Sequence, residues 1–302
     1  MQKVLITGGT GFLGTALVKV LKNLNYDITL LTHRIDKEHL NFELDLHIIN
    51  NIDQIKDNDI FDIVINLAGA PIFGCYWTKK RKALLRDSRI STTNKLVNKI
   101  RELREKPKLF ISGSAIGYYG EQGDNIVSED TISRSDFSQQ LCADWENEAL
   151  KVAELGIRVC LIRTGLVIGS GGGFLKSMIL PFKIGLGGKM GSGQQWMSWI
   201  HINDWIGIVL RMINDQSMCY AYNATAPHPV TNYEFTQVLA KSLNRFAVIP
   251  LPKPFLLVLL GEMSSLLLGS QRVLPKRLEA INFQFQFTDI SVALKDVLKK
   301  HE

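Results

Sequence analysis

The chain has 302 residues, of which 46% are hydrophobic and 21% are charged, and its formal net charge is +6 at pH 7. This length and apolar content exclude a disordered chain and suit one large α/β domain with a smaller appendage. Because the basic residues are dispersed along the chain, an anionic cofactor accounts for the charge, and we expect no nucleic acid as a partner.

The cysteine pattern and the most apolar stretch bear on further classes of protein. Four widely separated cysteines form neither a metal-binding spacing nor a disulfide framework, so we expect reduced thiols in a cytoplasmic protein and no metal. The apolar run at 255–268 is interrupted by Glu262 and is shorter than the ~18 residues that a membrane span needs. We predict a buried helix pair there and no membrane partner. A first strand at residue 3 also leaves no room for a signal peptide.

The first predicted element is a strand that runs into a glycine-rich turn, at residues 3–14 (K-V-L-I-T-G-G-T-G-F-L-G). Gly8 permits a tight turn, Gly11 lets the backbone approach a pyrophosphate, and Gly14 lets the next helix pack closely on the sheet. Apolar spacing predicts that helix over 13–24, with its amino end directed at the phosphates. We therefore predict a doubly wound parallel sheet, the Rossmann fold, and an ordinary strand-turn-helix connection is the alternative. The predicted cofactor contacts in the loop are Gly8, Thr10, Gly11, Phe12, Leu13 and Gly14.

The end of a second predicted strand, 28–32, indicates which cofactor is bound. Enzymes that hold NAD place an acidic residue there to accept from the ribose 2′-hydroxyl, whereas this chain has Thr32, His33 and Arg34. The Arg34 guanidinium suits a 2′-phosphate, because it donates two parallel hydrogen bonds to phosphate oxygens. We therefore predict NADP, and an ordinary surface arginine is the alternative interpretation of Arg34.

Two further strands and a long helix follow. Residues 46–49 and the continuous apolar run 60–68 are predicted as strands, the second of them buried on both faces. It ends in a turn of small residues, 66–70, which lets a dinucleotide lie against the backbone. The candidate contacts in this turn are Leu67, Ala68 and Gly69. A charge-rich helix is predicted over 78–103, and most of its cations are expected to form a solvated face.

A fifth strand, 109–112, opens into the loop S-G-S-A-I-G-Y-Y-G at 112–120, and here a resemblance becomes specific. Five motifs occur in the order seen in the extended short-chain dehydrogenase/reductase superfamily: T-G-G-T-G-F-L-G, N-L-A-G-A, S-G-S-A-I-G-Y-Y-G, R-T-G-L-V-I-G-S-G-G-G and S-W-I-H-I-N-D. The chain most closely resembles the atypical "epimerase family" branch, whose small carboxyl-terminal domain has a motif similar to residues 269–277. The resemblance implies further contacts with NADP at His33, Arg34, Leu67, Ala68, Arg89 and Val167.

The chain departs from the superfamily at its proton-transfer pair. Ordinary members use Tyr-x-x-x-Lys on one helix face, where the lysine lowers the pKa of the tyrosine so that the phenol exchanges a proton during hydride transfer. The corresponding helix is predicted over 136–155. Phe137 and Leu141 occupy the expected positions, and neither side chain can move a proton.

Other side chains are therefore candidates for catalysis. Ser114 can orient a substrate oxygen, and Tyr118 or Tyr119, on the loop after the fifth strand, can donate a proton. A packed loop with satisfied hydroxyls is the alternative for both tyrosines. Asp144 and Glu146 on the following helix are further candidates, although we expect Glu146 to be a surface carboxylate.

Glycine-rich segments follow the sixth predicted strand, 157–165. Residues 169–173 and 185–195 contain too much glycine for regular structure and are predicted to be loops that close over a ligand. A flexible linker is the alternative for the second loop. We expect a substrate wall from three side chains in or after it, Gln194, Trp196 and Trp199.

The carboxyl-terminal part begins with a predicted strand at 198–202 and a helix at 206–213, which Asn203 or Asp204 is expected to cap. His201 is expected to anchor a loop, since no second histidine lies at a metal-ligand spacing.

A proline-marked stretch at 250–254 separates a final unit. We predict a Rossmann domain at 1–230 and a small carboxyl-terminal domain at 231–302, with its core at about 249–297. The predicted function is an NADP-dependent oxidoreductase or sugar-type epimerase acting on a small hydroxyl or carbonyl compound. The alternative is a nucleotide-bound sensor that has lost turnover. The absence of the tyrosine-lysine pair favours this alternative. The identity of the substrate and the oligomeric state stay open.

Overall fold

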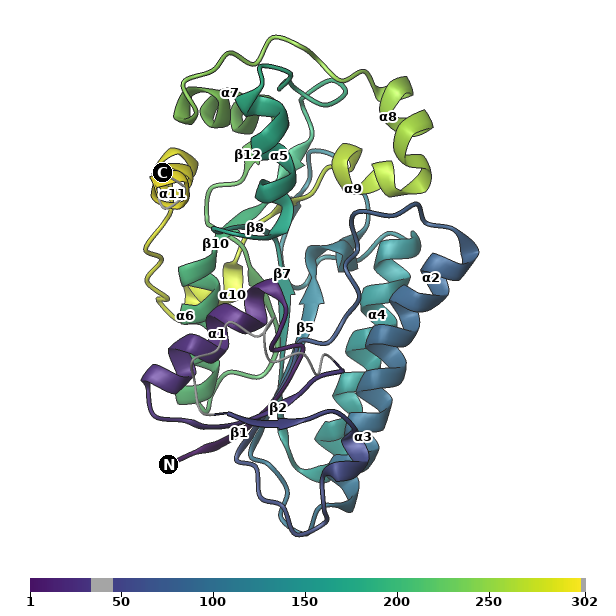
Figure 1. Cartoon of the computed structure of the whole chain (residues 1–302), viewed down its shortest axis with the longest axis vertical. Helices are drawn as coiled ribbons and strands as arrows, with labels where there is room; N and C mark the ends of the chain where they lie inside the picture. Colours follow the sequence, from purple (N-terminus) through teal and green to yellow (C-terminus); the bar gives the residue numbers. More distant parts are fainter. Residues whose placement is uncertain (34–45, 300–302) are drawn as a thin grey trace.

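The computed structural model describes residues 1–33 and 46–299 and is built on one central sheet (Figure 1). Seven parallel strands lie in the order β11-β7-β5-β4-β1-β2-β3. Their bounds are Lys3–Thr7 for β1, Asp27–Leu31 for β2, His47–Ile49 for β3, Ile63–Asn66 for β4, Leu109–Ala115 for β5, Arg158–Thr164 for β7 and Tyr220–Ala224 for β11. This arrangement confirms the predicted doubly wound parallel sheet, the Rossmann fold.

The strand order reverses between β1 and β4, which are neighbours in the sheet. β1 pairs with β2 on one side and with β4 on the other, so that Thr7 lies opposite both Leu31 and Asn66. In doubly wound sheets, a crevice for a ligand opens beyond the carboxyl ends of the strands at such a reversal. The residues that follow β1 and β4 therefore flank the predicted cofactor site.

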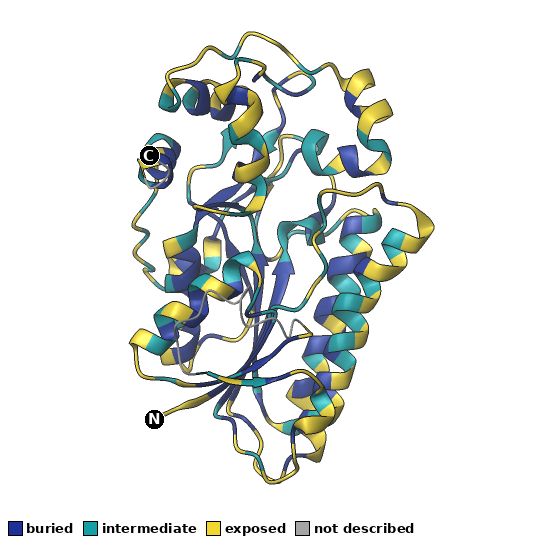
Figure 2. Cartoon of the chain, viewed as in Figure 1, coloured by how far each residue is buried: buried dark blue, intermediate teal, exposed yellow. Residues whose placement is uncertain are grey.

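Helices cover both faces of this sheet (Figures 1 and 2). α1 (Phe12–Asn23) and α6 (Ile202–Asn214) pack on one face, and α3 (Thr92–Glu102) and α4 (Phe137–Leu150) pack on the other. Each helix buries one stripe of apolar side chains at helical spacing against the strands. In α6 the stripe consists of Trp205, Ile208, Val209 and Met212.

The helix predicted over 78–103 changes its winding in the middle. α2 (Lys79–Arg86) begins after Thr78, whose hydroxyl accepts from the amide of Arg81 at 3.1 Å. Between α2 and α3, the segment Asp87–Ser91 forms a π-helical turn. Such turns redirect side chains within a helix and occur frequently at functional sites.

Shorter elements complete the chain, most of them above the sheet in Figure 1. Three pairs of short strands are β8 (Leu166–Ile168) with β10 (Trp199–His201), β9 (Trp196–Met197) with β12 (Val230–Thr231), and β6 (Ile126–Val127) with β13 (Arg272–Val273). The remaining α-helices are α5 (Gly173–Lys183), α7 (Asn232–Ser242), α8 (Lys253–Leu260), α9 (Ser265–Leu268), α10 (Lys276–Ala280) and α11 (Ile290–Lys299). Single 3₁₀ turns lie at Ile52–Gln54, Ile116–Tyr119, Lys151–Leu155 and Gly261–Ser264.

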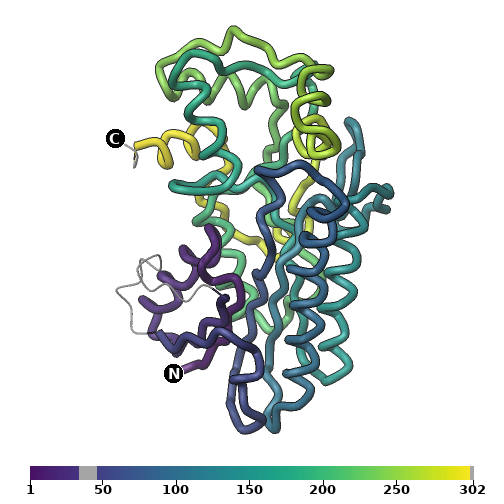
Figure 3. Tube along the Cα trace, turned by 45° about the vertical axis from the view of Figure 1, so that its right-hand side comes forward, coloured from purple at the N-terminus to yellow at the C-terminus, as the bar shows by residue number. Residues whose placement is uncertain are grey.

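The chain after α7 returns to the rest of the molecule several times (Figure 3). β13 pairs with β6, α10 packs on β11, and α11 contacts β8. The carboxylate of Asp204 accepts from the backbone amides of Gln286 at 2.7 Å and of Phe287 at 3.0 Å. These contacts join the two predicted domains, and their division at residue 230 stays a prediction.

The cap of α6 differs from the prediction. His201 is the N-cap, in place of Asn203 or Asp204, and its Nδ1 accepts from the amide of Asn203 at 3.2 Å. The buried imidazole also stacks on Phe287, with ring centroids 3.7 Å apart, and its Nε2 lies 3.4 Å from a carboxylate oxygen of Asp296. His201 therefore ties α6 to the carboxyl-terminal segment, in agreement with the loop-anchoring role expected from the sequence.

The prediction of a buried helix pair at 255–268 is wrong, because α9 has no buried residue and α8 has one. α8 and α9 both form, but α8 lies on the surface, where Val258 is 85% exposed and Phe255 is 52% exposed. Leu256 is the buried residue of α8. Within the described ranges, no helix combines the length and the apolar character that crossing a membrane requires.

Candidate functional site

The turn between β1 and α1 has the geometry of a phosphate-binding loop. Gly8 has a φ of +70°, and a Cβ on it would lie 2.4 Å from the carbonyl oxygen of Leu67. A Cβ on Gly14 would lie 2.3 Å from the carbonyl oxygen of Gly8, so the start of α1 packs directly on the turn. α1 begins at Phe12, and Gly11 is its N-cap with no side-chain hydrogen bond. The first amides of α1 are therefore available to an anionic ligand.

Arg89 brings a partly buried positive charge to the same crevice. The π-helical turn carries its guanidinium to Gly69, where an added Cβ would lie 2.9 Å from the guanidinium carbon. Nη1 of Arg89 donates to the carbonyl oxygen of Leu85 at 3.3 Å, and the guanidinium lies 5.3 Å from the centre of the Trp145 ring. Burial lowers the pKa of Arg89 from its ordinary value. This partly buried cation favours a ligand with negative charge.

Phe12 explains the glycine-rich segment at 169–173. A Cβ on Gly169 would lie 2.7 Å from the Phe12 ring, and a Cβ on Gly172 would lie 2.3 Å from it. The segment follows β8, whose Val167 is 9% exposed and belongs to the core that also contains α1 residues. The glycines therefore allow this segment to pack as a wall beside the phosphate loop, and α5 begins at its end.

The residues after β2 are described in part. Thr32 is buried, and its hydroxyl lies 3.5 Å from that of Thr10 in the phosphate loop. His33 is exposed at the end of the strand. Arg34, on which the prediction of NADP depends, lies outside the described residues, so its contact with a cofactor stays a prediction.

A network of buried polar side chains connects the loop after β5 to its neighbours. Ser114 donates its hydroxyl hydrogen to Oε1 of Glu146 at 2.6 Å. Arg163, on β7, donates from Nε and Nη2 to the two oxygens of Glu146, at 2.8 Å each. Its Nη1 donates to the hydroxyl of Tyr119 at 2.9 Å, and this hydroxyl donates to Oδ1 of Asn223 at 2.6 Å. The network thus joins β5, α4, β7 and β11.

The predicted catalytic residues differ in their exposure. Tyr119 is fully buried and Ser114 is 5% exposed, and burial raises the pKa of Tyr119 to about 12. Tyr118 is half-buried, with the guanidinium carbon of Arg163 3.4 Å from the centre of its ring. Glu146 is 3% exposed, so the expectation of a surface carboxylate is wrong. The hydroxyls of Ser114 and Tyr119 both donate hydrogen bonds within the network, which for Tyr119 agrees with the packed-loop alternative.

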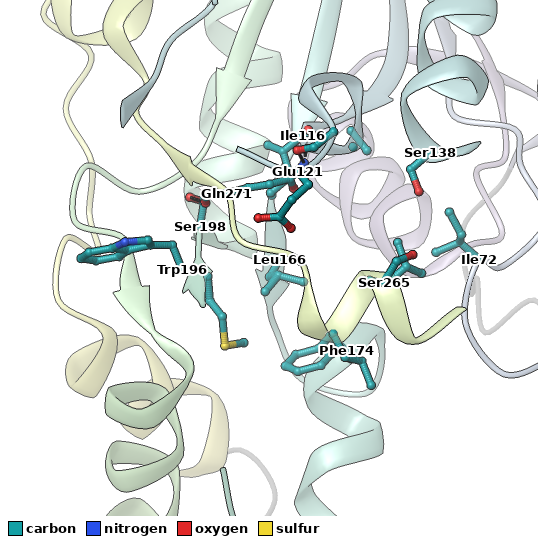
Figure 4. Close-up of a pocket in the computed structure, with 18 of the residues that line it drawn as sticks. Ile72, Ile116, Glu121, Ser138, Leu166, Phe174, Trp196, Ser198, Ser265 and Gln271 are labelled. Carbon is teal, nitrogen blue, oxygen red and sulfur yellow. Dashed lines mark hydrogen bonds between the residues drawn. The ribbon is translucent and has the colours of Figure 1, made fainter. Parts of the chain in front are cut away.

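A cavity of about 240 Å³ opens beyond the carboxyl ends of β5 and β7 (Figure 4). Its wall is formed by Phe73 after β4, Glu121 after β5, Ser138 on α4, Leu166 after β7 and Gln271 in the carboxyl-terminal segment. None of the three predicted catalytic side chains lines it. In doubly wound sheets, a cavity at these strand ends lies where a substrate meets a cofactor bound at the strand reversal.

Comparison with known proteins identifies the family. The NAD dependent epimerase/dehydratase family matches residues 4–224, and a domain of unknown function, DUF1731, matches residues 251–297. The chain belongs to the NAD dependent epimerase/dehydratase family. It is 35% identical over 306 residues to an epimerase family protein of Staphylococcus aureus strain N315, covering 99% of this chain and 100% of the relative. A Staphylococcus epidermidis relative is 37% identical over 308 residues, with the same coverage.

Solved structures with this epimerase/dehydratase fold are similar as well. The human epimerase family protein SDR39U1, crystallised with NADPH, is 32% identical, with a TM-score of 0.89 over 99% of both chains. A nucleoside-diphosphate sugar epimerase from Corynebacterium glutamicum is 31% identical, with a TM-score of 0.77 over 98% of this chain and 58% of that chain. A UDP-glucuronic acid 4-epimerase from Bacillus cereus, 18% identical, shares the fold, with a TM-score of 0.79. These similarities confirm the atypical extended short-chain dehydrogenase/reductase branch that the motifs predicted.

This member of the epimerase/dehydratase family presents an unexpected pair of side chains to the cavity. α4 is turned so that Ser138 and Cys142, four residues apart, line the cavity. Phe137 and Leu141 pack instead with Trp77, whose ring centroid lies 4.9 Å from that of Phe137. The face of α4 that lines the cavity is therefore offset by one residue from Phe137 and Leu141, the positions matched to the tyrosine-lysine pair. Burial raises the pKa of Cys142 to about 12, so its thiol stays protonated at neutral pH.

The carboxyl-terminal segment completes the cavity, which the sequence reasoning missed. Nε2 of Gln271 donates to the carbonyl oxygens of Ile116 at 3.1 Å and of Gly120 at 2.8 Å. Oε2 of Glu121 accepts from the amide of Ser270 at 2.8 Å. The G-S-Q run at 269–271 was the part of the sequence that could have pointed to this contact. As a motif, however, it indicated a domain of the epimerase family and did not predict that the segment touches the loop after β5.

The predicted tryptophan wall is present in part. Trp196 lines the cavity, and its Nε1 donates to Oδ1 of Asp124 at 3.1 Å. Trp199 is fully buried in the core, and its Nε1 donates to the carbonyl oxygen of His228 at 3.0 Å. Neither Trp199 nor Gln194 lines the cavity. Trp196 is thus the predicted wall residue that reaches the candidate substrate site.

The cysteines and acidic side chains show no metal-binding arrangement in the part of the chain that the structure describes. There, no group of three or more His, Cys, Asp or Glu side chains is placed to hold a metal ion. The four cysteines are free thiols: Cys75, Cys142, Cys160 and Cys219.

Proposed function

We propose that the chain is an NADP-dependent oxidoreductase or epimerase that acts on a hydroxyl or carbonyl group of a small molecule. The observation that carries the proposal is the close approach of Gly8 to Leu67 and of Gly14 to Gly8. This packing leaves a turn that a pyrophosphate can approach without meeting a side chain. The NADPH in the crystal structure of the similar human protein supports the choice of cofactor.

Different parts of the chain would hold different parts of the cofactor. The free amides at the start of α1 would bind the pyrophosphate, and Arg89 would add a positive charge beside Gly69. Arg34 is proposed to bind the 2′-phosphate. When bound, the nicotinamide supplies or accepts the hydride at the substrate carbon. The network of Glu146 and Arg163 would hold the loop after β5, so that the wall of the substrate cavity keeps its shape.

A sensor that binds NADP(H) without turnover is a second candidate. It is favoured by the pair that α4 presents to the cavity, because neither the Ser138 hydroxyl nor the protonated Cys142 thiol exchanges a proton readily at neutral pH. Measuring NADPH oxidation with a panel of small ketones and aldehydes distinguishes the two candidates. The enzyme is expected to oxidise NADPH with at least one carbonyl compound, whereas binding without oxidation across the panel supports the sensor.

Calorimetric titration with NADPH tests the cofactor site. Gly8→Ala is expected to abolish measurable binding, because the added Cβ would lie 2.4 Å from the carbonyl oxygen of Leu67. Gly156→Ala is a matched control, since Gly156 has a similar φ of +74° and open space around it. It should keep the parent affinity. Absence of heat with the parent protein, or full affinity in a folded Gly8→Ala variant, contradicts the proposal.

A further inference from the structure

The charged side chains that line the cavity all have one sign. Two carboxylates, Glu121 and Asp136, line it, and no Lys, Arg or His is among the described residues of its wall. Much of the remaining wall is apolar and includes Leu166, Phe174 and Trp196 (Figure 4). A ligand that fills the cavity therefore meets an apolar surface and negative charge.

Glu121 is held in place by backbone amides. Its Oε1 accepts from Gly123 at 3.0 Å, and its Oε2 accepts from Ser270 at 2.8 Å. A carboxylate has about four acceptor positions, so two of them remain for a ligand. In Figure 4 the carboxylate of Glu121 points into the cavity, between Ser198 and Leu166. Glu121 is thus a fixed acceptor that faces the space where a substrate would lie.

Nearby cations have other partners. Arg134 donates from Nη1 to the backbone carbonyl oxygen of Glu121 at 3.4 Å. The guanidinium carbon of Arg272 lies 4.3 Å from the centre of the Trp196 ring, and Lys82 forms an ion pair with Glu262. None of these three cations is among the lining residues. In the part of the chain that the structure describes, the Glu121 carboxylate accepts from backbone amides, which donate hydrogen bonds without bringing a full positive charge.

We infer that the substrate is a small, mainly apolar compound whose polar end donates hydrogen bonds to Glu121, as an ammonium or a hydroxyl group does. This inference rests on the proposed function, which places the substrate in the cavity next to the bound cofactor. Glu121 is exposed to solvent in the free protein, and at contact distance its charge attracts a cation and repels an anion. Glu121 is then the residue that determines specificity.

A nucleotide sugar does not suit this cavity. Its diphosphate needs cations and several hydrogen-bond donors, and the described wall has no cationic side chain. The volume of about 240 Å³ is also below the ~300–1,000 Å³ of sites that hold drug-sized ligands. The substrate therefore belongs to a different class from the nucleoside-diphosphate sugars for which the Corynebacterium glutamicum relative is named.

Four probes test this inference on the full chain with NADPH bound. Phenethylamine, phenethyl alcohol and phenylpropionate share an apolar body and differ in their polar ends, and UDP-glucose represents the nucleotide sugars. In calorimetric titrations at millimolar probe concentrations, we expect the amine and the alcohol to bind at least about tenfold more tightly than the carboxylate. UDP-glucose should not bind. Preferred binding of the carboxylate or of UDP-glucose, or no binding of the amine and the alcohol, overturns the inference.

Glu121→Gln tests the role of the charge. It keeps the size of the side chain, so the affinity for phenethylamine should fall by about tenfold and that for phenethyl alcohol by less than about threefold. Glu262→Gln is the matched control, because it neutralises a carboxylate outside the cavity wall. Thermal unfolding shows whether each variant is folded. An unchanged amine affinity in folded Glu121→Gln contradicts the inference, and so does an equal loss in the control.

The same titrations separate this inference from the proposed function. If NADPH binds and UDP-glucose also binds in the cavity, the substrate class is wrong and the cofactor assignment stands. If the parent protein does not bind NADPH, the proposed function fails. The order of probe affinities in the free protein then still tests the character of the cavity.

Discussion

Arg163 contacts both carboxylate oxygens of Glu146, with Nε and Nη2 each 2.8 Å from an oxygen. The two side chains are 6% and 4% exposed, so water does not screen the pair. An intact buried pair adds little stability relative to apolar side chains of the same size, but a single charge left behind is costly. The pair therefore holds the loop after β5 in place, and removing either side chain leaves the other as an unpaired buried charge.

Glu146→Leu should destabilise the protein strongly. It leaves the Arg163 guanidinium buried without its carboxylate, so the free energy of unfolding should fall by about 3–5 kcal/mol. Urea unfolding measures this change. Glu154→Leu is the control, because Glu154 is 69% exposed and lies 3.5 Å from Arg101, and it should cost less than about 1 kcal/mol. Similar losses in the two variants would show that the buried pair has no special role.

The buried phenol of Tyr119 should make the stability depend on alkaline pH. Folding raises its pKa from 10.0 to about 12, so the folded protein holds the phenolic proton more tightly than the unfolded chain. The resulting stability is fully present below pH 10 and is lost as the pH rises toward about 12. The loss should amount to roughly 2–3 kcal/mol. Urea unfolding between these pH values measures it.

Tyr119→Phe should remove this part of the pH dependence, whatever its effect at neutral pH. Tyr220→Phe is the control, because Tyr220 is 62% exposed. It should keep the slope of the parent protein. A slope that survives in Tyr119→Phe would assign the alkaline transition to other groups.

Arg89→Met should weaken NADPH and NADH by similar factors. The 2′-phosphate is expected at the end of β2. Arg89 lies at Gly69, after β4, which is on the other side of β1 from β2. It therefore acts on a part that both cofactors share, and a loss of about tenfold is expected for each. Arg86→Met is the control, because Arg86 pairs with Asp144 at 2.6 Å on a more exposed face. Calorimetry with both cofactors checks the prediction, and a loss limited to NADPH would refute it.

Arg34→Asp should discriminate between the cofactors. A carboxylate at this position repels a 2′-phosphate and can accept from a 2′-hydroxyl, so the affinity for NADPH should fall at least about tenfold more than that for NADH. NADH serves as the internal control. Comparable losses for the two cofactors would show that Arg34 does not bind the 2′-phosphate.

The register of α4 shows where prediction from the sequence stopped. Phe137 with Leu141 and Ser138 with Cys142 are both pairs at a spacing of four, so either can occupy one face of the helix. A rotation of about 100° exchanges one pair for the other. Packing of Phe137 against Trp77 selects the orientation, and that contact joins segments far apart in the chain.

The sequence alone determined the parallel sheet and the phosphate loop, because their signals are local: a run of strand residues, glycines within one turn, and a helical spacing directly afterwards. Only the tertiary structure decided which side chains line the cavity. Glu121 and Gln271 meet there because the carboxyl-terminal segment packs back onto the loop after β5. No local pattern encodes a contact between residues so distant in the chain, since it depends on how whole elements bury their apolar faces together.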